Sequence, residues 1–374
     1  MKTKVWIVIW GLKDGGAEVL AREYARLVDK QKFDATIVTM YPFENTANYR
    51  RAKEAQLKIV SVFKKRNTIT RAIRVLFGKW YIPLALRKML KKDRPDTIHF
   101  NSEMAQYFVP VKNQLSGINL IYTCHNEVDK YFSDDEKTAI QEIDKVNNFQ
   151  IIALHEDMKK ELDCFFSKKD TIVIRNGVEF ERFRKPQVDK ELMRESLGIE
   201  KNAYLVGHIG RFALQKNHEF LLQIFHKVTQ KKQNARLLLI GNGDLKDNIL
   251  QTIDQMNLRD RVTVLSHRTD IPELLNTMDI MIFPSFFEGL SVTLVEAQVA
   301  GVRCIISDTI NPANHLTENI IPVSLEKSAA EWADIVLDES IKNTVYGNIN
   351  DYDMTREIHR LEQVYRGEMD IKND

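Results

Sequence analysis

Cysteine is scarce in this sequence, and the few cysteines form no pattern. The chain has three, Cys124, Cys164 and Cys304, and they lie far apart without the close spacing of metal ligands. Such usage excludes a small disulfide-stapled secreted scaffold and a cysteine-based zinc site. We expect three buried free thiols in a reducing compartment.

Long hydrophobic runs are also missing. No run approaches the roughly 18 apolar residues that a transmembrane helix needs. The amino-terminal run VWIVIW is too short for the core of a signal peptide, and no small-residue cleavage site follows it. We therefore interpret it as a strand and place the protein in the cytoplasm.

Acidic residues are absent from residues 61–92, which hold ten Lys and Arg interleaved with apolar and aromatic side chains such as Trp80 and Tyr81. A basic amphipathic stretch is typical of an anionic membrane surface. An ordinary helix with a solvated basic face explains the pattern equally well. No nucleic-acid-binding module is visible. We predict peripheral attachment to the inner face of the cytoplasmic membrane and no nucleic-acid partner.

Short apolar runs alternate with helix-length segments along the whole chain. This alternation predicts an α/β fold with doubly wound parallel sheets. A polar stretch around residues 183–194, with Pro186, reads as a linker between two series of strands. We therefore predict two Rossmann-like domains facing across a cleft, residues 1–185 and 186–351.

Residues 279–308 read DIMIFPSFFEGLSVTLVEAQVAGVRCIISD and predict a strand, a loop, a helix and a second strand. Ser291 is a candidate helix cap, and Gly301 ends the helix. The loop lies at the carboxyl end of its strand, where open parallel sheets bind ligands. It carries Glu288, and the helix carries Glu296.

The free amides at the start of this helix favour an anion such as a phosphate. Acidic side chains repel phosphate, so Glu288 and Glu296 fit uncharged hydroxyl groups better, as in a sugar. Together, the helix start and the two glutamates favour a nucleotide sugar as the ligand. The alternative is that both are ordinary surface acids.

The full string resembles the signature of retaining GT-B glycosyltransferases of the large nucleotide-sugar family, family 4. The two spaced glutamates of that family fall on Glu288 and Glu296, and the run EGLSVTLVEAQVAG is most similar to the exopolysaccharide and capsular-polysaccharide branch. The resemblance implies a GT-B fold whose last helix, within residues 352–374, packs back on the acceptor-binding first domain. It also implies transfer of a hexose-type sugar from a UDP-sugar to a hydroxyl of a lipid-linked saccharide.

Within the resemblance, Glu288 binds sugar hydroxyls, Glu296 the ribose, and the backbone of the helix start the phosphates. The residues of that start are Gly289, Leu290, Ser291, Val292 and Thr293.

Two cations follow an earlier strand in the string GHIGRFALQKN. Arg211 and Lys216 could neutralise a diphosphate and the charge that grows on it as it leaves. Two solvated cations are the alternative. Gly210 with Arg211, and Lys216 with Asn217, resemble the family's pattern at this loop.

Three further motifs are weaker. Gly15 and Gly16 lack the dinucleotide spacing G-x-G-x-x-G but resemble the family's glycine loop near acceptor and diphosphate. Gly241 and Gly243 resemble its turn near the nucleotide. His125, followed by Asn126 and Glu127, matches a position where an imidazole contacts the donor sugar, although a strand-end histidine is more often structural.

The sequence Asp351-Tyr352-Asp353 spells a metal motif of another glycosyltransferase fold, but it lies in the tail before a helix, where helix capping explains it. We predict no metal and no cofactor beyond the donor. Two alternatives stay open: a GT-B UDP-sugar epimerase, and a nucleotide-sugar-binding protein without activity.

Overall fold

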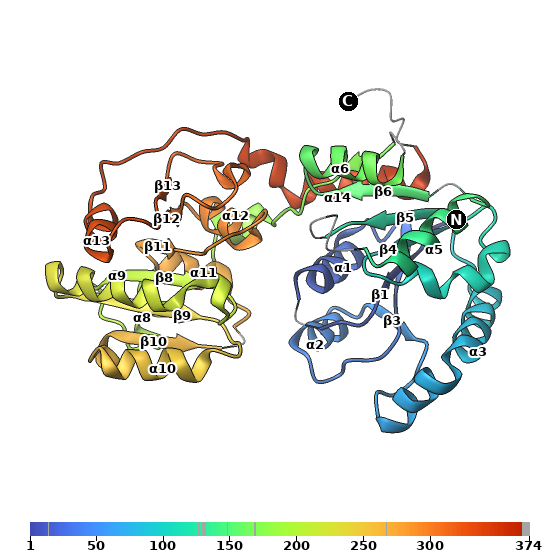
Figure 1. The fold of residues 1–374 in the computed structure, drawn as a ribbon, viewed down its shortest axis with the longest axis horizontal. Coiled ribbons are helices and arrows are strands. Elements are labelled where there is room, and N and C mark those ends of the chain that lie inside the picture. Colours follow the sequence, from blue (N-terminus) through green and yellow to red (C-terminus); the bar gives the residue numbers. More distant parts are fainter. Residues whose placement is uncertain are drawn as a thin grey trace. The chain divides into compact units, whose positions relative to one another are not determined.

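The computed structural model describes residues 1–13, 15–125, 128, 132–147, 149–167, 170–266 and 268–368. The chain divides into two compact units (Figure 1). The first comprises Met1–Asn176 and Thr355–Asp374, and the second comprises Gly177–Met354. Each is built around one parallel sheet.

The sheet of the first unit has seven parallel strands in the order β3-β2-β1-β4-β5-β6-β7. The strands are β1 (Thr3–Ile9), β2 (Phe33–Thr39), β3 (Lys58–Ser61), β4 (Thr97–Phe100), β5 (Asn119–Thr123), β6 (Phe149–Ala153) and β7 (Ile172–Val173). The helices are α1 (Gly16–Leu27), α2 (Ala47–Glu54), α3 (Thr68–Lys92), α5 (Asp134–Asp144), α6 (Glu156–Phe166) and α14 (Met354–Arg366), with the short 3₁₀ helices η1 (Ala105–Tyr107) and η2 (Val109–Gln114).

Helix α14 joins the first unit although it lies at the other end of the sequence. Its Tyr365 accepts a hydrogen bond from Thr97 Oγ1 at 2.8 Å through its carbonyl, and its hydroxyl lies 2.8 Å from Nδ1 of His99. Glu362 accepts from the backbone amide of Asp29 at 2.7 Å, and Glu357 accepts from that of Arg175 at 2.7 Å. These bonds connect α14 to three separate parts of the unit.

The sheet of the second unit has six parallel strands in the order β10-β9-β8-β11-β12-β13. The strands are β8 (Tyr204–Ile209), β9 (Ala235–Ile240), β10 (Val262–Leu265), β11 (Ile280–Phe283), β12 (Arg303–Ser307) and β13 (Ile320–Val323). The helices are α7 (Phe180–Arg184), α8 (Lys190–Ser196), α9 (His218–Lys231), α10 (Lys246–Gln255), α11 (Ile271–Thr277), α12 (Val292–Val299) and α13 (Ala329–Leu337), with the 3₁₀ helices η3 (Leu214–Lys216), η4 (Arg259–Arg261), η5 (Pro312–Asn314) and η6 (Ile349–Tyr352).

Both faces of this second sheet are covered. Alternate strand residues point to opposite faces, so Met281 and Phe283 belong to one core and Ile280 and Ile282 to another. Helices α8, α11 and α12 pack in the first core, and α9, α10 and α13 pack in the second. The prediction of an α/β fold with two doubly wound, Rossmann-like parallel-sheet domains is confirmed.

The prediction that residues 183–194 form a linker is wrong. Residues 183–194 fall largely in α7 and α8, and Phe180, Phe183 and Met193 are buried in the core of the second unit. The first unit accordingly ends at Asn176, whereas the sequence places the boundary after residue 185. Polar residues misled the prediction because only one face of each short helix is apolar.

Glycine at position 177 allows a close approach of two chain segments. Its φ is not positive, but a Cβ there would lie 2.7 Å from the backbone of Met354. Val178 and Asp353 form a parallel β-bridge at this point, so the two chain segments run too close for a side chain.

The expectation of three buried thiols fails at one position. Cys164 is exposed, whereas Cys124 and Cys304 are buried as predicted. Strand β13 contains Pro322, and proline is tolerated there since β13 is an edge strand.

Candidate functional site

The loop between β11 and α12 is anchored at several points. Ser285 accepts hydrogen bonds through its carbonyl from the hydroxyls of Ser307 and Thr309. The amide of Phe286 donates to the carbonyl of Gln215 at 2.9 Å, and the Gln215 side chain donates to the carbonyl of Phe287 at 2.9 Å. The loop that carries Glu288 is thereby fixed to the loop that follows β8.

Lys216 and Glu288 form an ion pair in this position. The Nζ of Lys216 lies 2.6 Å from Oε1 of Glu288, and the two side chains are only 13% and 9% exposed. The same ammonium lies 4.5 Å from the ring centroid of Phe283, in cation–π contact. Two predicted site residues that are far apart in sequence are therefore in direct contact.

The backbone next to Lys216 is closely packed through glycines. A Cβ at Gly241 would lie 1.9 Å from the carbonyl oxygen of Gly210, and one at Gly243 would lie 2.4 Å from that of Phe212. Both glycines therefore let the loop after β9 approach the loop after β8. Arg211, which stands between Gly210 and Phe212, has an exposed side chain.

Two buried histidines that the sequence did not single out lie beneath this loop. His208 Nδ1–H donates to the carbonyl of Ile282 at 2.8 Å, and its ring packs against those of His218 and Phe283. Burial lowers the pKa of His218 to about 4 and that of His208 well below its usual value. Both are therefore neutral at pH 7, which lets Lys216 sit beside them without repulsion.

Helix α12 begins at the other side of the loop. Ser291 is its N-cap residue, as predicted, but its side chain makes no capping hydrogen bond. Instead the buried Asn314 accepts from the Ser291 amide at 2.9 Å and donates to the carbonyl of Gly289 at 2.8 Å.

Asn314 was missed because it is contributed by the distant η5 segment. Within the part of the chain that the structure describes, the amides of Val292 and Thr293 have no hydrogen-bond acceptor. They form an open helix start, a geometry that favours anions, next to the half-buried Leu290.

Glu296 lies one turn further along α12. Burial raises the pKa of its carboxyl to about 7, and the positive charge of Arg182 offsets this only in part. At the other end of the helix, Gly301 has a φ of +78° and its amide donates to the carbonyl of Gln298, so the predicted helix end is confirmed.

The raised pKa of Glu296 predicts a pH-dependent stability. Between its ordinary pKa of 4.5 and its folded-state pKa of about 7, the folded protein binds more protons than the unfolded chain. Stability attributable to Glu296 therefore falls as pH rises through this window. We expect Glu296→Gln to raise the melting temperature more at pH 8 than at pH 5, as measured by thermal unfolding. If the difference in melting temperature between Glu296→Gln and the wild type did not change with pH, the raised pKa of Glu296 would be contradicted.

In the first unit, Gly15 and Gly16 begin α1. Gly15 is the N-cap and offers no side chain to the first turn, and nothing lies within 4 Å of the position that a Cβ on Gly16 would occupy. The space above Gly16 is therefore open, whereas the carboxylate of Glu18 lies over Gly15.

His125 follows β5. The side-chain amide nitrogen of Asn101 donates to the carbonyl of His99. The Oδ1 of the same side chain can then accept from His125 Nε2–H at 3.1 Å. The unprotonated Nδ1 is buried without a partner in the described part of the chain. Burial lowers the pKa of His125 to about 4, so its free nitrogen can accept a hydrogen bond from a hydroxyl.

The neighbours of His125 differ in what the structure shows of them. Asn126 and Glu127, which the sequence groups with it, lie outside the described residues. His99 is a core residue that contacts the Tyr365 hydroxyl through Nδ1 and the Thr123 hydroxyl through Nε2.

No group of three or more His, Cys, Asp or Glu that could hold a metal occurs among the described residues. Asp351 lies in the 3₁₀ helix η6, and Asp353 pairs with Val178 in the bridge that joins the two segments. The Asp-x-Asp motif thus lies in the segment that precedes α14 and pairs with Val178.

Two family models match consecutive parts of the chain. The one described as "Glycosyltransferase Family 4" matches residues 14–182, and the one described as "Glycosyl transferases group 1" matches residues 189–347. The first match begins after β1 and ends within α7, and the second covers all six strands of the second unit.

Named relatives and solved structures agree with these matches. The UDP-Gal:alpha-D-GlcNAc-diphosphoundecaprenol alpha-1,3-galactosyltransferase of Escherichia coli is 25% identical over 308 residues, covering 75% of this chain and 78% of the relative. The capsular polysaccharide biosynthesis glycosyltransferase CapM of Staphylococcus aureus is 26% identical over 212 residues, covering 53% and 55%. The crystal structure of Anabaena HepE in complex with UDP and glucose is 18% identical and covers 98% of this chain and 100% of its own, with a TM-score of 0.74. The chain is therefore a glycosyltransferase with the GT-B fold.

Proposed function

We propose that this chain is a retaining hexosyltransferase of family 4 that uses a UDP-sugar and extends a lipid-linked saccharide in exopolysaccharide or capsule biosynthesis. The observation that carries the proposal is the Lys216–Glu288 ion pair next to the open amides of α12. A cation and a helix start fit a diphosphate, and the carboxylate fits a sugar hydroxyl. The UDP-Gal donor and diphosphoundecaprenol acceptor in the name of the E. coli relative support the choice of substrates.

Each group of the second unit has a separate task with the donor. Arg211, Lys216 and the amides of Val292 and Thr293 bind the diphosphate. Glu288 keeps Lys216 in place with Oε1 and accepts a sugar hydroxyl with its other oxygen. Glu296 accepts hydrogen bonds from the ribose hydroxyls, and these bonds favour the charged form of a carboxyl whose pKa burial raises to about 7.

In the transfer step, the acceptor hydroxyl oxygen bonds to the anomeric carbon as the bond from that carbon to the diphosphate oxygen breaks. The departing phosphate takes the proton of the hydroxyl, so no dedicated base and no metal is required. Lys216 and Arg211 neutralise the negative charge that develops on the leaving diphosphate. His125 orients the donor sugar through its free Nδ1, and the glycine start of α1 receives the acceptor side.

Release of UDP from UDP-sugars tests this proposal. We expect release that depends on an acceptor lipid, persists in EDTA, and gives a product whose anomeric configuration, measured by NMR, equals that of the donor. A panel of nucleotide sugars screened by thermal shift would first identify the donor, since a bound ligand raises the melting temperature.

Other outcomes of the same assay would contradict the proposal. Release of UDP without an acceptor, together with a changed sugar, would indicate an epimerase. Donor binding without any release would indicate a binding protein. A strict requirement for Mn²⁺ or Mg²⁺ would remove the metal-free mechanism.

We further propose that α3 attaches the enzyme to the inner face of the cytoplasmic membrane. Within the described chain, no helix is long and apolar enough to cross a bilayer. The second half of α3 packs on the sheet through Ile82, Leu86 and Leu90, whereas its first half exposes Phe77 (61%) and Trp80 (81%) beside the basic residues. Exposed aromatic and basic side chains on one helix are typical of a membrane surface.

Liposome co-sedimentation measures this attachment. We expect binding that needs anionic lipid, weakens with salt, and drops when Lys64, Lys65, Arg66, Arg71 and Arg74 are all changed to Gln, since each contributes about 1 kcal/mol near an anionic surface. Changing Lys227 and Lys231 of α9 to Gln is the matched control and should not affect binding. Equal binding by all variants, or none by the wild type, would show that α3 is only a solvated surface helix.

A further inference from the structure

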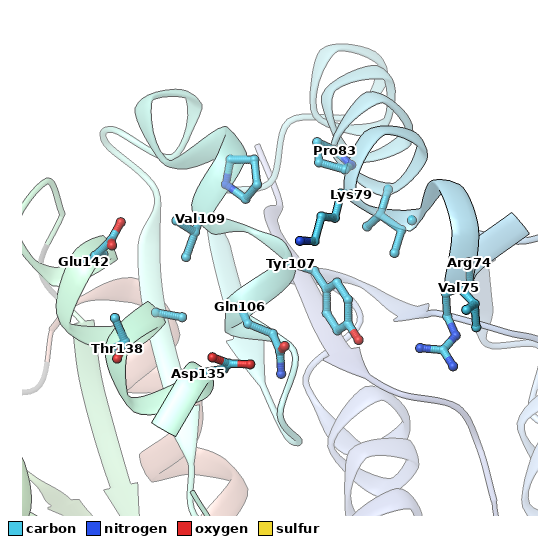
Figure 2. A pocket seen from close by; sticks show the side chains of 14 residues that line it. Arg74, Val75, Lys79, Pro83, Gln106, Tyr107, Val109, Asp135, Thr138 and Glu142 are labelled. Atoms are coloured by element: carbon cyan, nitrogen blue, oxygen red, sulfur yellow. The ribbon is translucent and has the colours of Figure 1, made fainter. Parts of the chain in front are cut away.

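A groove of about 770 Å³ lies in the first unit between α3, the η1–η2 segment and α5 (Figure 2). None of the residues to which the sequence assigns a part in catalysis or donor binding lines it. Its size and position therefore call for a different ligand.

The walls of the groove are mainly apolar. Val75, Ile82 and Pro83 of α3 form one wall, and Val109 and Pro110 of η2 form another. Gly78 provides the space between them, because it has no side chain. A slot of this kind suits an apolar chain better than a sugar.

One end of the groove is cationic and lies near Trp10, which precedes the loop with Gly15 and Gly16. The guanidinium of Arg74 lies 5.4 Å from the ring centroid of Trp10, and its Nε is buried without a hydrogen-bond partner in the described chain. Tyr107 lies on the same side in Figure 2, and its ring centroid is 6.1 Å from that of Trp10. Trp10 follows β1 and precedes the glycine loop, so this end points toward the carboxyl edge of the sheet.

The acidic residues of the groove lie on the opposite wall. Asp135 and Glu142 belong to α5, and Glu142 is paired with Lys112 at 3.0 Å. Lys79 joins Arg74 on the α3 wall. An anionic group would therefore lie against α3, away from α5.

We propose that this groove binds the isoprenoid chain of a polyprenyl diphosphate acceptor, with the diphosphate at Arg74. An apolar slot ending in a cation matches an amphiphile of this kind. The groove borders the exposed apolar residues of α3, so a chain can enter it from a membrane while its remaining isoprene units stay in the bilayer. The identity of this ligand rests on the proposed lipid-linked acceptor.

Filling the groove tests the inference. A Cβ at Gly78 would contact only the side chains of Ile82 and Arg74, at 3.6 and 3.7 Å, so a larger side chain fits the helix without a backbone clash. Gly78→Leu fills the slot, and Gly78→Ala is the matched control that leaves it open. The probe is farnesyl diphosphate, which is soluble and carries no sugar, and binding is measured by calorimetric titration.

We expect farnesyl diphosphate to bind the wild type and Gly78→Ala at least tenfold more tightly than Gly78→Leu. Inorganic diphosphate should bind all three equally and more weakly. Equal binding of farnesyl diphosphate to all three, or no preference over inorganic diphosphate, would overturn the proposal. So would displacement of the probe by short-chain phosphatidylglycerol at the same concentration, since the ligand would then be an ordinary phospholipid.

The same variants separate this inference from the proposed function. Gly78→Leu should raise the KM for a long-chain lipid-linked acceptor at least tenfold and leave transfer to the same saccharide on a short soluble aglycone unchanged. An equal loss with both acceptors would contradict the groove but not the transferase. Tight binding of farnesyl diphosphate by a protein that transfers no sugar would contradict only the transferase.

Discussion

Lys216→Ala is expected to lower kcat/KM for sugar transfer by about 10²- to 10³-fold, the loss typical of removing one group that stabilises developing negative charge. In the structure Lys216 is held by Glu288 at 2.6 Å and by the ring of Phe283, so the substitution removes an ammonium from a fixed position. Steady-state kinetics with donor and acceptor measure the effect, and circular dichroism checks the fold.

The control for this experiment is Lys231→Ala, which removes a solvent-exposed lysine paired with Asp334 on the same unit. It should leave kcat/KM unchanged. Glu288→Gln should also reduce transfer, and the double variant should lose less than the two single losses combined, because the two side chains touch. Normal turnover by folded Lys216→Ala would contradict the assignment of Lys216 to the donor site.

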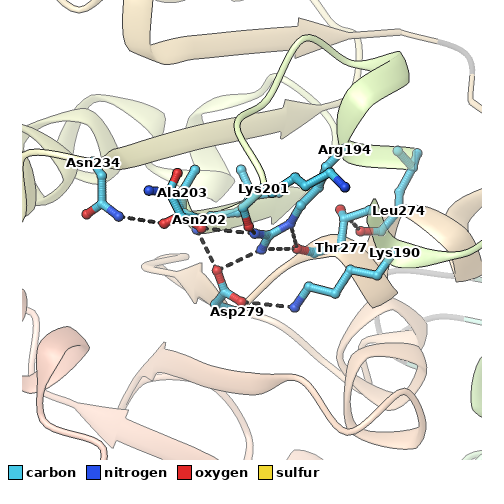
Figure 3. Close-up of polar contacts among 10 residues, drawn as sticks. Lys190, Arg194, Lys201, Asn202, Ala203, Asn234, Leu274, Thr277 and Asp279 are labelled. Carbon is cyan, nitrogen blue, oxygen red and sulfur yellow. Dashed lines mark hydrogen bonds and ion pairs between the residues drawn. The ribbon is translucent and has the colours of Figure 1, made fainter. Parts of the chain in front are cut away.

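Arg194→Ala is expected to destabilise the second unit by about 3–5 kcal/mol, the usual cost of breaking a buried ion pair. Its guanidinium donates to the carbonyls of Thr277, Lys201 and Ala203 and lies 2.8 Å from Asp279 (Figure 3). The side chain is 4% exposed, so its removal leaves these acceptors without water or a replacement donor. Urea unfolding followed by circular dichroism measures the change.

Lys190→Ala is the matched control, because Lys190 pairs with the same Asp279 at 3.0 Å but is 41% exposed. Its loss should cost less than about 1 kcal/mol, as for other surface pairs. If the two variants unfold at the same urea concentration, burial does not decide the strength of this network.

Much of the fold could be predicted from local pattern alone. β4, β8 and β11 are short apolar runs bounded by turn residues, and such runs are the pattern that predicts a parallel α/β fold here. The order of the strands could not be predicted in this way. β8 and β11 are neighbours, and this brings the loop with Lys216 against the loop with Glu288.

The residues that support the site were harder to find. Asn314, His208 and His218 act through buried contacts with distant backbone or rings, and nothing in their own sequence neighbourhood indicates such contacts. The buried position of Arg194 could not be predicted for the same reason. Its contacts with Thr277 and Asp279 join residues that are far apart in the sequence.

The return of α14 to the first unit sets the order in which the chain can fold during synthesis. Residues 177–354 form the second unit from one uninterrupted segment, which can fold as soon as it leaves the ribosome. The first sheet emerges earlier but lacks part of its packing until α14 is made, because Phe33 and His99 both contact Tyr365. A chain that stops after residue 354 would therefore carry a finished second unit and an unfinished first one, open to proteases.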